Sequence, residues 1–183
     1  MRVFIGIALN AEEKAFLKRV QDRIKETALK GNFTHFHNFH TTIRFIGDIS
    51  IAQVDDVVEA MDLAASNIQS FFIKIGDIGA FERGRKKIMW VNIPEGKPKL
   101  LKLRRTLDDA LNENGIEREQ RKFQPHITIA REVVLSERMN SISPFPVYQS
   151  YVHVNAITLF ESRREHGVLT YVPIHETLLE ETD

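Results

Sequence analysis

The sequence predicts an α+β fold of two similar lobes related by approximate two-fold symmetry. Two observations support this prediction. Short apolar runs typical of buried strands alternate with segments whose apolar residues recur at the three- and four-residue spacing of a helix. In addition, one succession of strand, helix and strand occurs twice at a constant offset. We therefore expect a single bilobal domain over residues 1–183, with an internal repeat at about 2–47 and 88–133.

The first repeat is expected to begin with a buried strand, the apolar run Val3–Leu9. Asn10 and Glu13 then form a capping-box pattern, which predicts the start of a helix whose apolar face continues to Ala28. Thr42–Ile46 is expected to be the second strand of the repeat.

The segment between the repeats is expected to contain a helix and a hairpin. Ser50 and Gln53 form a second capping-box pattern ahead of an apolar stripe, which predicts a helix start. Phe71–Ile78 and Ile88–Ile93 are expected to be strands, and Glu82–Lys87 between them has the composition of a basic hairpin tip.

The second repeat is expected to contain the third helix. Pro98 suits the first turn of this helix, and Gly115 suits its end. The remaining strands are expected at His126–Ala130, Tyr151–Phe160 and Leu169–Ile174.

Composition and charge exclude several classes of protein. The chain has 25 Lys and Arg residues and 25 Asp and Glu residues, so its formal net charge is zero. A protein that wraps duplex nucleic acid is usually basic overall, so any contact with nucleic acid should be local. The absence of cysteine excludes disulfides, thiolate zinc sites and a cysteine nucleophile, and it fits a cytoplasmic location. The apolar N-terminal run is expected to be a strand rather than a signal peptide, and no run approaches the roughly 20 residues of a membrane helix.

A repeated His-x-Thr motif is the most informative feature of the sequence. The tetrad His40–Ile43 recurs as His126–Ile129 at an offset of 86 (126 − 40 = 86). The same offset relates Val3–Ile7 to Met89–Ile93 and the first helix to the third. Because residues i and i+2 of a strand share a face, each His points the same way as its Thr. Packing of the two lobes across the symmetry axis would bring the two pairs face to face over one cleft.

Two histidines and two threonines around one cleft suit acid–base chemistry on a phosphate. One neutral imidazole can accept a proton while a protonated imidazole donates another, and Thr hydroxyls can donate hydrogen bonds to phosphate oxygens. Two His residues without a carboxylate make a poor metal site, so we expect neither a metal nor another cofactor. His35 and His37 also lack a third ligand in the sequence pattern, and we expect them to be exposed.

The motifs resemble those of a known superfamily. The segments from His40 to Gly47, His-x-Thr-x-Arg-Phe-Ile-Gly, and from Pro125 to Arg131, Pro-His-x-Thr-x-x-Arg, resemble the paired motifs of two-histidine (2H) phosphoesterases. Within that superfamily the sequence is most similar to the RNA 2′,3′-cyclic phosphodiesterases, also called 2′-5′ RNA ligase-like proteins. The resemblance implies two lobes, each an antiparallel sheet with helices on its outer face, flanking a central cleft. It also implies hydrolysis of RNA 2′,3′-cyclic phosphate ends to 2′-phosphomonoesters without metal or ATP, and in some members reversible 2′-5′ ligation.

The resemblance assigns roles to the motif residues. By motif position we expect His40 and His126 to be catalytic, and Thr42 and Thr128 to bind phosphate. The family favours His126 as the base and His40 as the acid. Arg131 matches a motif-end Arg that binds phosphate, but its odd offset from His126 points it away from the cleft unless the strand ends or bulges there.

The remaining expectations concern the substrate. Cations of the hairpin tip could steer an RNA backbone, or they could simply be solvated; Phe45 could stack a terminal base, or it could belong to the core. Two other functions stay open, a nucleotide- or RNA-binding module without catalysis and a phosphodiesterase for small cyclic nucleotides. No obligate protein partner is evident. The candidate RNA contacts are Phe45, Arg83, Arg85, Lys86, Lys87, Arg121 and Lys122.

Overall fold

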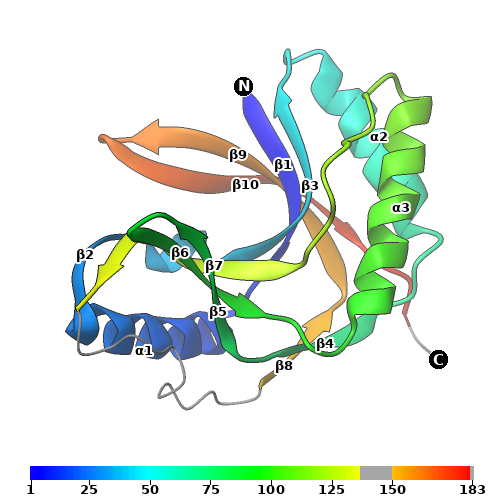
Figure 1. Cartoon of the computed structure of the whole chain (residues 1–183). Helices are drawn as coiled ribbons and strands as arrows, with labels where there is room; N and C mark the ends of the chain where they lie inside the picture. Colours follow the sequence, from blue (N-terminus) through cyan, green and yellow to red (C-terminus); the bar gives the residue numbers. More distant parts are fainter. Residues whose placement is uncertain (137–149, 182–183) are drawn as a thin grey trace.

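Two four-stranded antiparallel sheets form the framework of the molecule (Figure 1). The computed structural model of the chain describes residues 1–136 and 150–181. Sheet A consists, in spatial order, of β10 (Val168–Leu178), β9 (Ala156–Glu165), β1 (Arg2–Ala8) and β3 (His40–Asp48). Sheet B consists of β2 (Ala28–Phe33), β7 (His126–Leu135), β6 (Lys86–Asn92) and β5 (Ile78–Arg83). A separate ribbon pairs β4 (Phe71–Ile75) with β8 (Ser150–Val154).

The helices are exchanged between the two sheets. Helix α1 (Ala11–Thr27) follows β1 of sheet A but packs on β2 and β7 of sheet B. Helix α3 (Lys97–Glu113) follows β6 of sheet B but packs on β3 of sheet A, together with α2 (Gln53–Ala65), which contacts β9 and β10. The expected α+β architecture of two antiparallel sheets with outer helices is confirmed. Each sheet is covered by a helix from the other half of the chain, which ties the two halves together.

Local sequence signals explain where two of the helices begin. The Asn10 side chain accepts a hydrogen bond from the Glu13 amide (2.8 Å), and the Glu13 carboxylate accepts one from the Asn10 amide (2.8 Å), so the expected capping box is present. Pro98 lies in the first turn of α3, as expected. The second capping-box pattern forms only in part. Gln53 Oε1 accepts hydrogen bonds from the Ser50 amide (3.0 Å) and the Ser50 hydroxyl (3.2 Å), but α2 begins at Gln53 with Ala52 as its N-cap, so Ser50 does not cap the helix.

Two strand predictions need correction, and one strand was not predicted. The run Phe71–Ile78 was expected to be one strand, but its first part, β4, lies in the two-stranded ribbon and its end begins β5 in sheet B. Tyr151–Phe160 divides in the same way into β8 and β9, because β8 must pair with β4 while β9 joins sheet A. Strand β2 was not predicted, because its first residue, Ala28, falls on the apolar face expected of the first helix; pairing with β7 makes Ala28–Phe33 a strand.

The repeat is visible in the order of strands, but the register of its first strand differs from the expected one. Thr42 of β3 lies opposite Gly6, whereas Thr128 of β7 lies opposite Trp90. The offset of 86 would instead place Phe4 opposite Thr42, so β1 is shifted by two residues relative to β6. Because side chains alternate with a period of two, this shift keeps the same residues on the same face. The division of the chain into one bilobal domain with an internal repeat stays a prediction.

Both His-x-Thr strands carry a bulge at the same place. In β3 the extra residue lies between Thr42 and Arg44, and in β7 it lies between Thr128 and Ala130. Each bulge reverses the alternation of side chains beyond it. The two strands also contact one another at the centre of the molecule, where the sheets meet. Among the described residues, no helix combines the length and the apolar character that a membrane crossing requires.

Candidate active site

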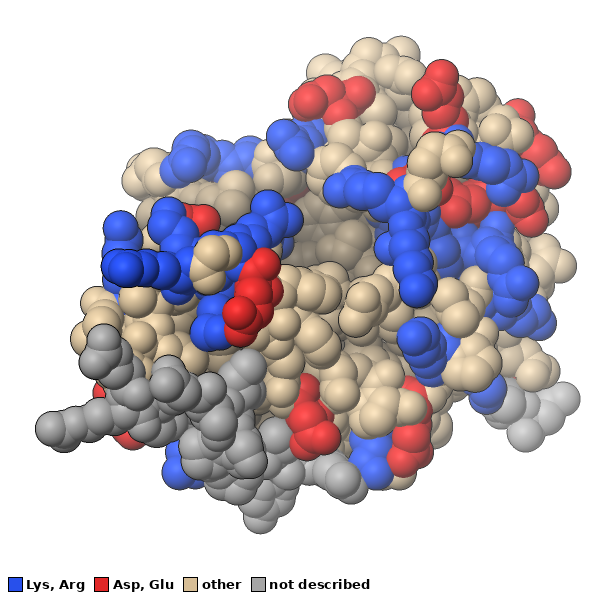
Figure 2. Space-filling view, viewed as in Figure 1, with Lys and Arg blue, Asp and Glu red and all other residues tan. Residues whose placement is uncertain are grey.

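A cavity of about 790 Å³ opens between the two sheets. Figure 2 shows it as a hollow with Lys and Arg side chains on both sides. Its walls come from β3, β7, the β9–β10 hairpin and the segment 117–124 that leads into β7. Glu119 is the single acidic residue among the described residues that line it. The cavity is therefore strongly cationic although the chain is neutral overall; its basic lining residues are Arg2, Arg104, Arg121, Lys122, Arg131, Arg163 and Arg164.

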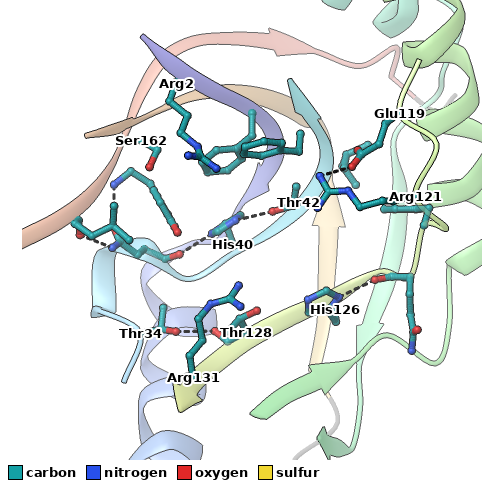
Figure 3. A pocket seen from close by; sticks show the side chains of 18 of the residues that line it. Arg2, Thr34, His40, Thr42, Glu119, Arg121, His126, Thr128, Arg131 and Ser162 are labelled. Carbon is teal, nitrogen blue, oxygen red and sulfur yellow. Dashed lines mark hydrogen bonds and ion pairs between the residues drawn. The ribbon is translucent and has the colours of Figure 1, made fainter. Parts of the chain in front are cut away.

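The two histidines of the motifs line this cavity from β3 and β7 (Figure 3). Nδ1 of His40 donates to the Asn38 carbonyl (2.7 Å), and Nδ1 of His126 donates to the Gln124 carbonyl (2.7 Å). A carbonyl only accepts hydrogen bonds, so Nδ1 carries the proton in each neutral ring and Nε2 is the free acceptor. Nε2 of His40 lies 2.8 Å from Thr42 Oγ1, so the Thr42 hydroxyl donates to it.

The surroundings of the two rings differ. His40 packs among Phe4, Tyr171 and Phe160, with ring centroids 4.8, 5.0 and 5.9 Å away. Burial lowers the pKa of His40 from 6.5 to about 4, although the hydrogen bond to the Asn38 carbonyl opposes this effect. His40 is therefore neutral at pH 7 in the free protein.

His126 has a looser aromatic environment. It contacts Phe81 and Trp90 at centroid distances of 5.9 and 6.2 Å, both edge to face. Trp90 lies in β6 and Phe81 in the adjacent strand β5, where they form a wall beside the ring. The matched motifs therefore present two imidazoles of similar geometry but unequal burial.

The bulge in β7 brings Arg131 into the cavity. Strict alternation from His126 predicts that Arg131 points away, and the extra residue between Thr128 and Ala130 reverses that direction. Arg131 and Thr128 both line the cavity, and Figure 3 shows them on the same side of β7. The sequence allowed Arg131 to contribute only if the strand ended or bulged near it, and the bulge is present. Its role in binding phosphate stays a prediction.

Phe45 lies in the cavity wall beneath two guanidinium groups. The Arg2 and Arg121 guanidiniums lie 5.0 and 5.6 Å from the centre of its ring. Arg121 is held in turn by Glu119 (2.5 Å), which also pairs with Arg104 (3.3 Å). A base that enters this side of the cavity would meet a surface of stacked aromatic and guanidinium planes.

The hairpin tip lies outside the cavity. Arg83 ends β5, Arg85 lies in the turn and Lys86 begins β6, and none of them lines the cavity. Lys86 forms an ion pair with Glu132, and Lys87 forms one with Glu82. Their contact with RNA stays a prediction, and it applies only to a substrate that extends beyond the cavity.

Several lining residues were not singled out from the sequence. Arg163 and Arg164 of the β9–β10 hairpin follow Phe160 and Glu161, just as the basic residues of the β5–β6 tip follow Phe81 and Glu82. That echo was a usable signal. No sequence signal pointed to Asn38, Arg104 or Glu119, because only the packing of distant segments brings them to the cavity.

His35 and His37 are exposed, as expected, with ring centroids 6.1 Å apart. Within residues 1–136 and 150–181, no three His, Cys, Asp or Glu side chains gather in a way that could hold a metal ion.

The chain is similar to known proteins both in sequence and in fold. The family model of the 2′-5′ RNA ligase superfamily matches residues 37–166. The RNA 2′,3′-cyclic phosphodiesterase of Aeropyrum pernix is 29% identical over 166 residues, which cover 90% of this chain and 93% of that protein. The protein of the same name from Escherichia coli is 28% identical over 185 residues, which cover 94% and 93%.

Two solved structures share the fold. The crystal structure of Escherichia coli LigT complexed with 3′-AMP matches with a TM-score of 0.78 at 24% identity over 97% of both chains. The crystal structure of TT0787 from Thermus thermophilus matches with a TM-score of 0.80 at 19% identity over the whole of both chains. The resemblance seen in the sequence is confirmed, and so is the fold that it implied.

Proposed function

Because the chain belongs to the 2′-5′ RNA ligase superfamily, we propose that it is an RNA 2′,3′-cyclic phosphodiesterase that opens the cyclic phosphate to a 2′-phosphomonoester. The relatives from Aeropyrum pernix and Escherichia coli carry that name and match over at least 90% of the chain. One observation supports this proposal above the others: equivalent strands bring His40, Thr42, His126 and Thr128 to one cationic cavity. Because that cavity takes residues from both sheets, we also propose that the whole chain acts as one bilobal domain.

The proposed reaction needs one base and one acid. A water oxygen attacks phosphorus while one imidazole Nε2 removes the water proton. The bond from phosphorus to O3′ breaks, and O3′ receives a proton from the other imidazole, which leaves a 3′-hydroxyl and a 2′-phosphate. In both histidines Nδ1–H donates to a carbonyl, which leaves Nε2 as the nitrogen that exchanges a proton, unprotonated in the base and protonated in the acid.

The electrostatics favour His40 as the base. Its lowered pKa keeps it neutral, and a neutral imidazole is what proton removal from water requires. His126 then supplies the proton to O3′. This assignment is the reverse of the one that the family resemblance favoured. Water or the phosphate must displace the Thr42 hydroxyl from His40 Nε2 when substrate binds, which frees that hydroxyl for a phosphate oxygen.

The differences between the two walls orient the substrate. Thr128 and the Arg131 guanidinium lie on the β7 side and suit the charged phosphate oxygens. Phe45, with Arg2 and Arg121 over its ring, lies on the β3 side and suits a flat base. The terminal nucleoside is therefore placed over β3 and its cyclic phosphate toward β7.

The test is an incubation with an oligonucleotide that ends in a 2′,3′-cyclic phosphate, with identification of the product isomer. We expect the 2′-phosphomonoester to accumulate. A protein that binds this oligonucleotide but returns its end unchanged is a binding module instead. A cyclic mononucleotide assayed in parallel separates the remaining alternative, since a small-nucleotide enzyme turns it over at least as fast as the oligonucleotide.

A further inference from the structure

Asn38 makes three hydrogen bonds around His40. It ends the short 3₁₀ turn Phe36–Asn38 before β3, and its backbone carbonyl accepts the Nδ1 proton of His40 (2.7 Å). Its side-chain Nδ2 donates to the Leu169 carbonyl (2.8 Å), and its Oδ1 accepts from the Tyr171 amide (3.0 Å). Only 6% of the residue is exposed. The amide thus uses both its donor and its acceptor on the backbone of β10.

These bonds connect strands that are not neighbours. In sheet A, β3 and β10 lie at opposite edges, with β1 and β9 between them. Asn38 joins the beginning of β3 to β10 directly, and it does so at Tyr171, whose ring stands edge-on against His40 at 5.0 Å. The same side chain therefore fixes the carbonyl that holds His40 Nδ1 and the strand that carries a ring packed on His40.

The other histidine has no such support. Gln124 occupies the position equivalent to Asn38 (38 + 86 = 124), and its carbonyl holds Nδ1 of His126 (2.7 Å). Its side chain makes no hydrogen bond to the described part of the chain, and the Gln124–His126 bond lies in an exposed place. Of the two imidazoles, only His40 is therefore bound to a residue whose side chain also hydrogen-bonds a distant strand of the same sheet.

We propose that Asn38 is a positioning residue that holds His40 in one tautomer and one orientation, with an unprotonated Nε2 facing the cavity. Its backbone carbonyl acts on the ring, and its side chain determines where that carbonyl lies. The consequence for rate rests on the proposed function, whereas the tautomer is a property of the free protein. A displacement of about 1 Å at a reacting group can cost roughly 10²-fold in rate, so loss of the side chain should matter.

The tautomer is measured first in the wild-type protein, by nitrogen-15 NMR of the imidazole rings at neutral pH. We expect His40 to show a protonated Nδ1 and an unprotonated Nε2. A protonated Nε2 in the wild-type protein overturns the proposal without any variant being made. This measurement also stands if the chain proves inactive on cyclic phosphates, so it separates failure of this proposal from failure of the proposed function.

Variants then test the side chain. Asn38→Ala removes both bonds to β10, and Asn38→Ser keeps a smaller hydroxyl that can form one of them. Asn114→Ala is the control, since its amide bonds the Ala110 carbonyl (2.9 Å) at the end of α3 and does not line the cavity. We expect kcat on a cyclic-phosphate oligonucleotide to fall roughly ten- to a hundredfold in Asn38→Ala and less in Asn38→Ser, with KM nearly unchanged. The variants with lower kcat should also show a second His40 tautomer in the nitrogen-15 spectrum, while the chemical shifts of His126 stay unchanged.

Two results would contradict the positioning role. One is a folded Asn38→Ala protein with the kcat of the wild type. The other is a lower kcat with the His40 tautomer unchanged, which would mean that Asn38 only supports the fold. If Asn38→Ala does not fold, the same two readings are taken on Asn38→Ser.

Discussion

Phe45 and Arg131 occupy equivalent places after matched bulges in β3 and β7, and both side chains line the same cavity. They are separated by the offset of the repeat (131 − 45 = 86). The two halves thus present the same His and Thr pair but differ at the next position on that face. One half offers an aromatic ring and the other a guanidinium, which gives a nearly symmetric site a direction.

The first prediction concerns Arg131. Arg131→Ala should lower kcat/KM about ten- to a hundredfold, because a charge-assisted hydrogen bond contributes about 1.5–3 kcal/mol. The loss should be similar for a cyclic mononucleotide and for an oligonucleotide, since Arg131 acts on the terminal phosphate that both contain. Arg131→Lys should recover part of it. A loss confined to the oligonucleotide would move Arg131 from the cyclic phosphate to the RNA strand.

The second prediction concerns the basic hairpin tip. Replacement of Arg83, Arg85 and Lys86 by Ala should weaken binding of long RNA and reduce the salt dependence of that binding. Cyclic mononucleotides should be unaffected, because these side chains lie outside the cavity. The measurement is the slope of log Kd against log salt for both ligands. An equal change for both ligands, or no change for either, would remove the tip from the RNA path.

The third prediction tests the partnership of the histidines. His40→Ala and His126→Ala should each reduce single-turnover hydrolysis by about 10²–10⁴, the contribution typical of general acid–base catalysis. If both act in one concerted step, the double variant should be scarcely slower than the slower single variant. Near-normal turnover in either single variant would show that the two-histidine mechanism is wrong for this chain and would favour the binding module.

The sequence predicts the His-x-Thr pairs well because the relevant physics is local. A strand alternates its side chains with a period of two, so His40 and Thr42 share a face wherever that strand lies. The repeat then predicts a matching face around His126. What the sequence could not supply is the exchange of α1 and α3 between the sheets, because it depends on which apolar faces meet in space.

Arg131 illustrates a different limit. Its direction depends on one extra residue in β7, and that bulge arises from the pairing of β7 with β6 rather than from any residue within the motif. The role of Asn38 also depends on contacts that are not local. Its bonds to β10 join residues more than 130 positions apart, so no local pattern predicts them.

The fourth prediction concerns the pH dependence of the rate. If neutral His40 is the base, kcat/KM should rise with pH on an acid limb near pH 4. The Thr42 hydroxyl can donate to Nε2 of the neutral ring and accept from Nε2–H of the charged ring, so Thr42→Val removes a partner of both forms and makes the surroundings of the ring less polar. The acid limb should therefore stay near pH 4 or move to lower pH. Thr128→Val is the matched control, because in the described residues the Thr128 hydroxyl makes no such bond to His126; an acid limb that moves to higher pH in Thr42→Val alone would contradict the assignment.

The last prediction concerns stability, which tests the burial of His40 without any substrate. The folded-state pKa of about 4 lies below the value of 6.5 expected in the unfolded chain. Between these pH values the unfolded chain binds a proton at His40 that the folded protein does not, so the free energy of unfolding falls as the pH is lowered from about 6.5 towards 4 and falls no further below it. At about 1.4 kcal/mol per pKa unit, the full change is up to about 3 kcal/mol.

Other groups titrate in the same range, so the measurement compares the wild type with His40→Gln by denaturant unfolding at pH 7.5 and pH 4. Groups common to both proteins cancel in the difference, and so does any constant cost of the substitution. We expect the stability of the wild type relative to His40→Gln to be lower at pH 4 than at pH 7.5 by up to about 3 kcal/mol. An unchanged difference would show that His40 titrates as in the unfolded chain, and the argument for His40 as the neutral base would lose its electrostatic support.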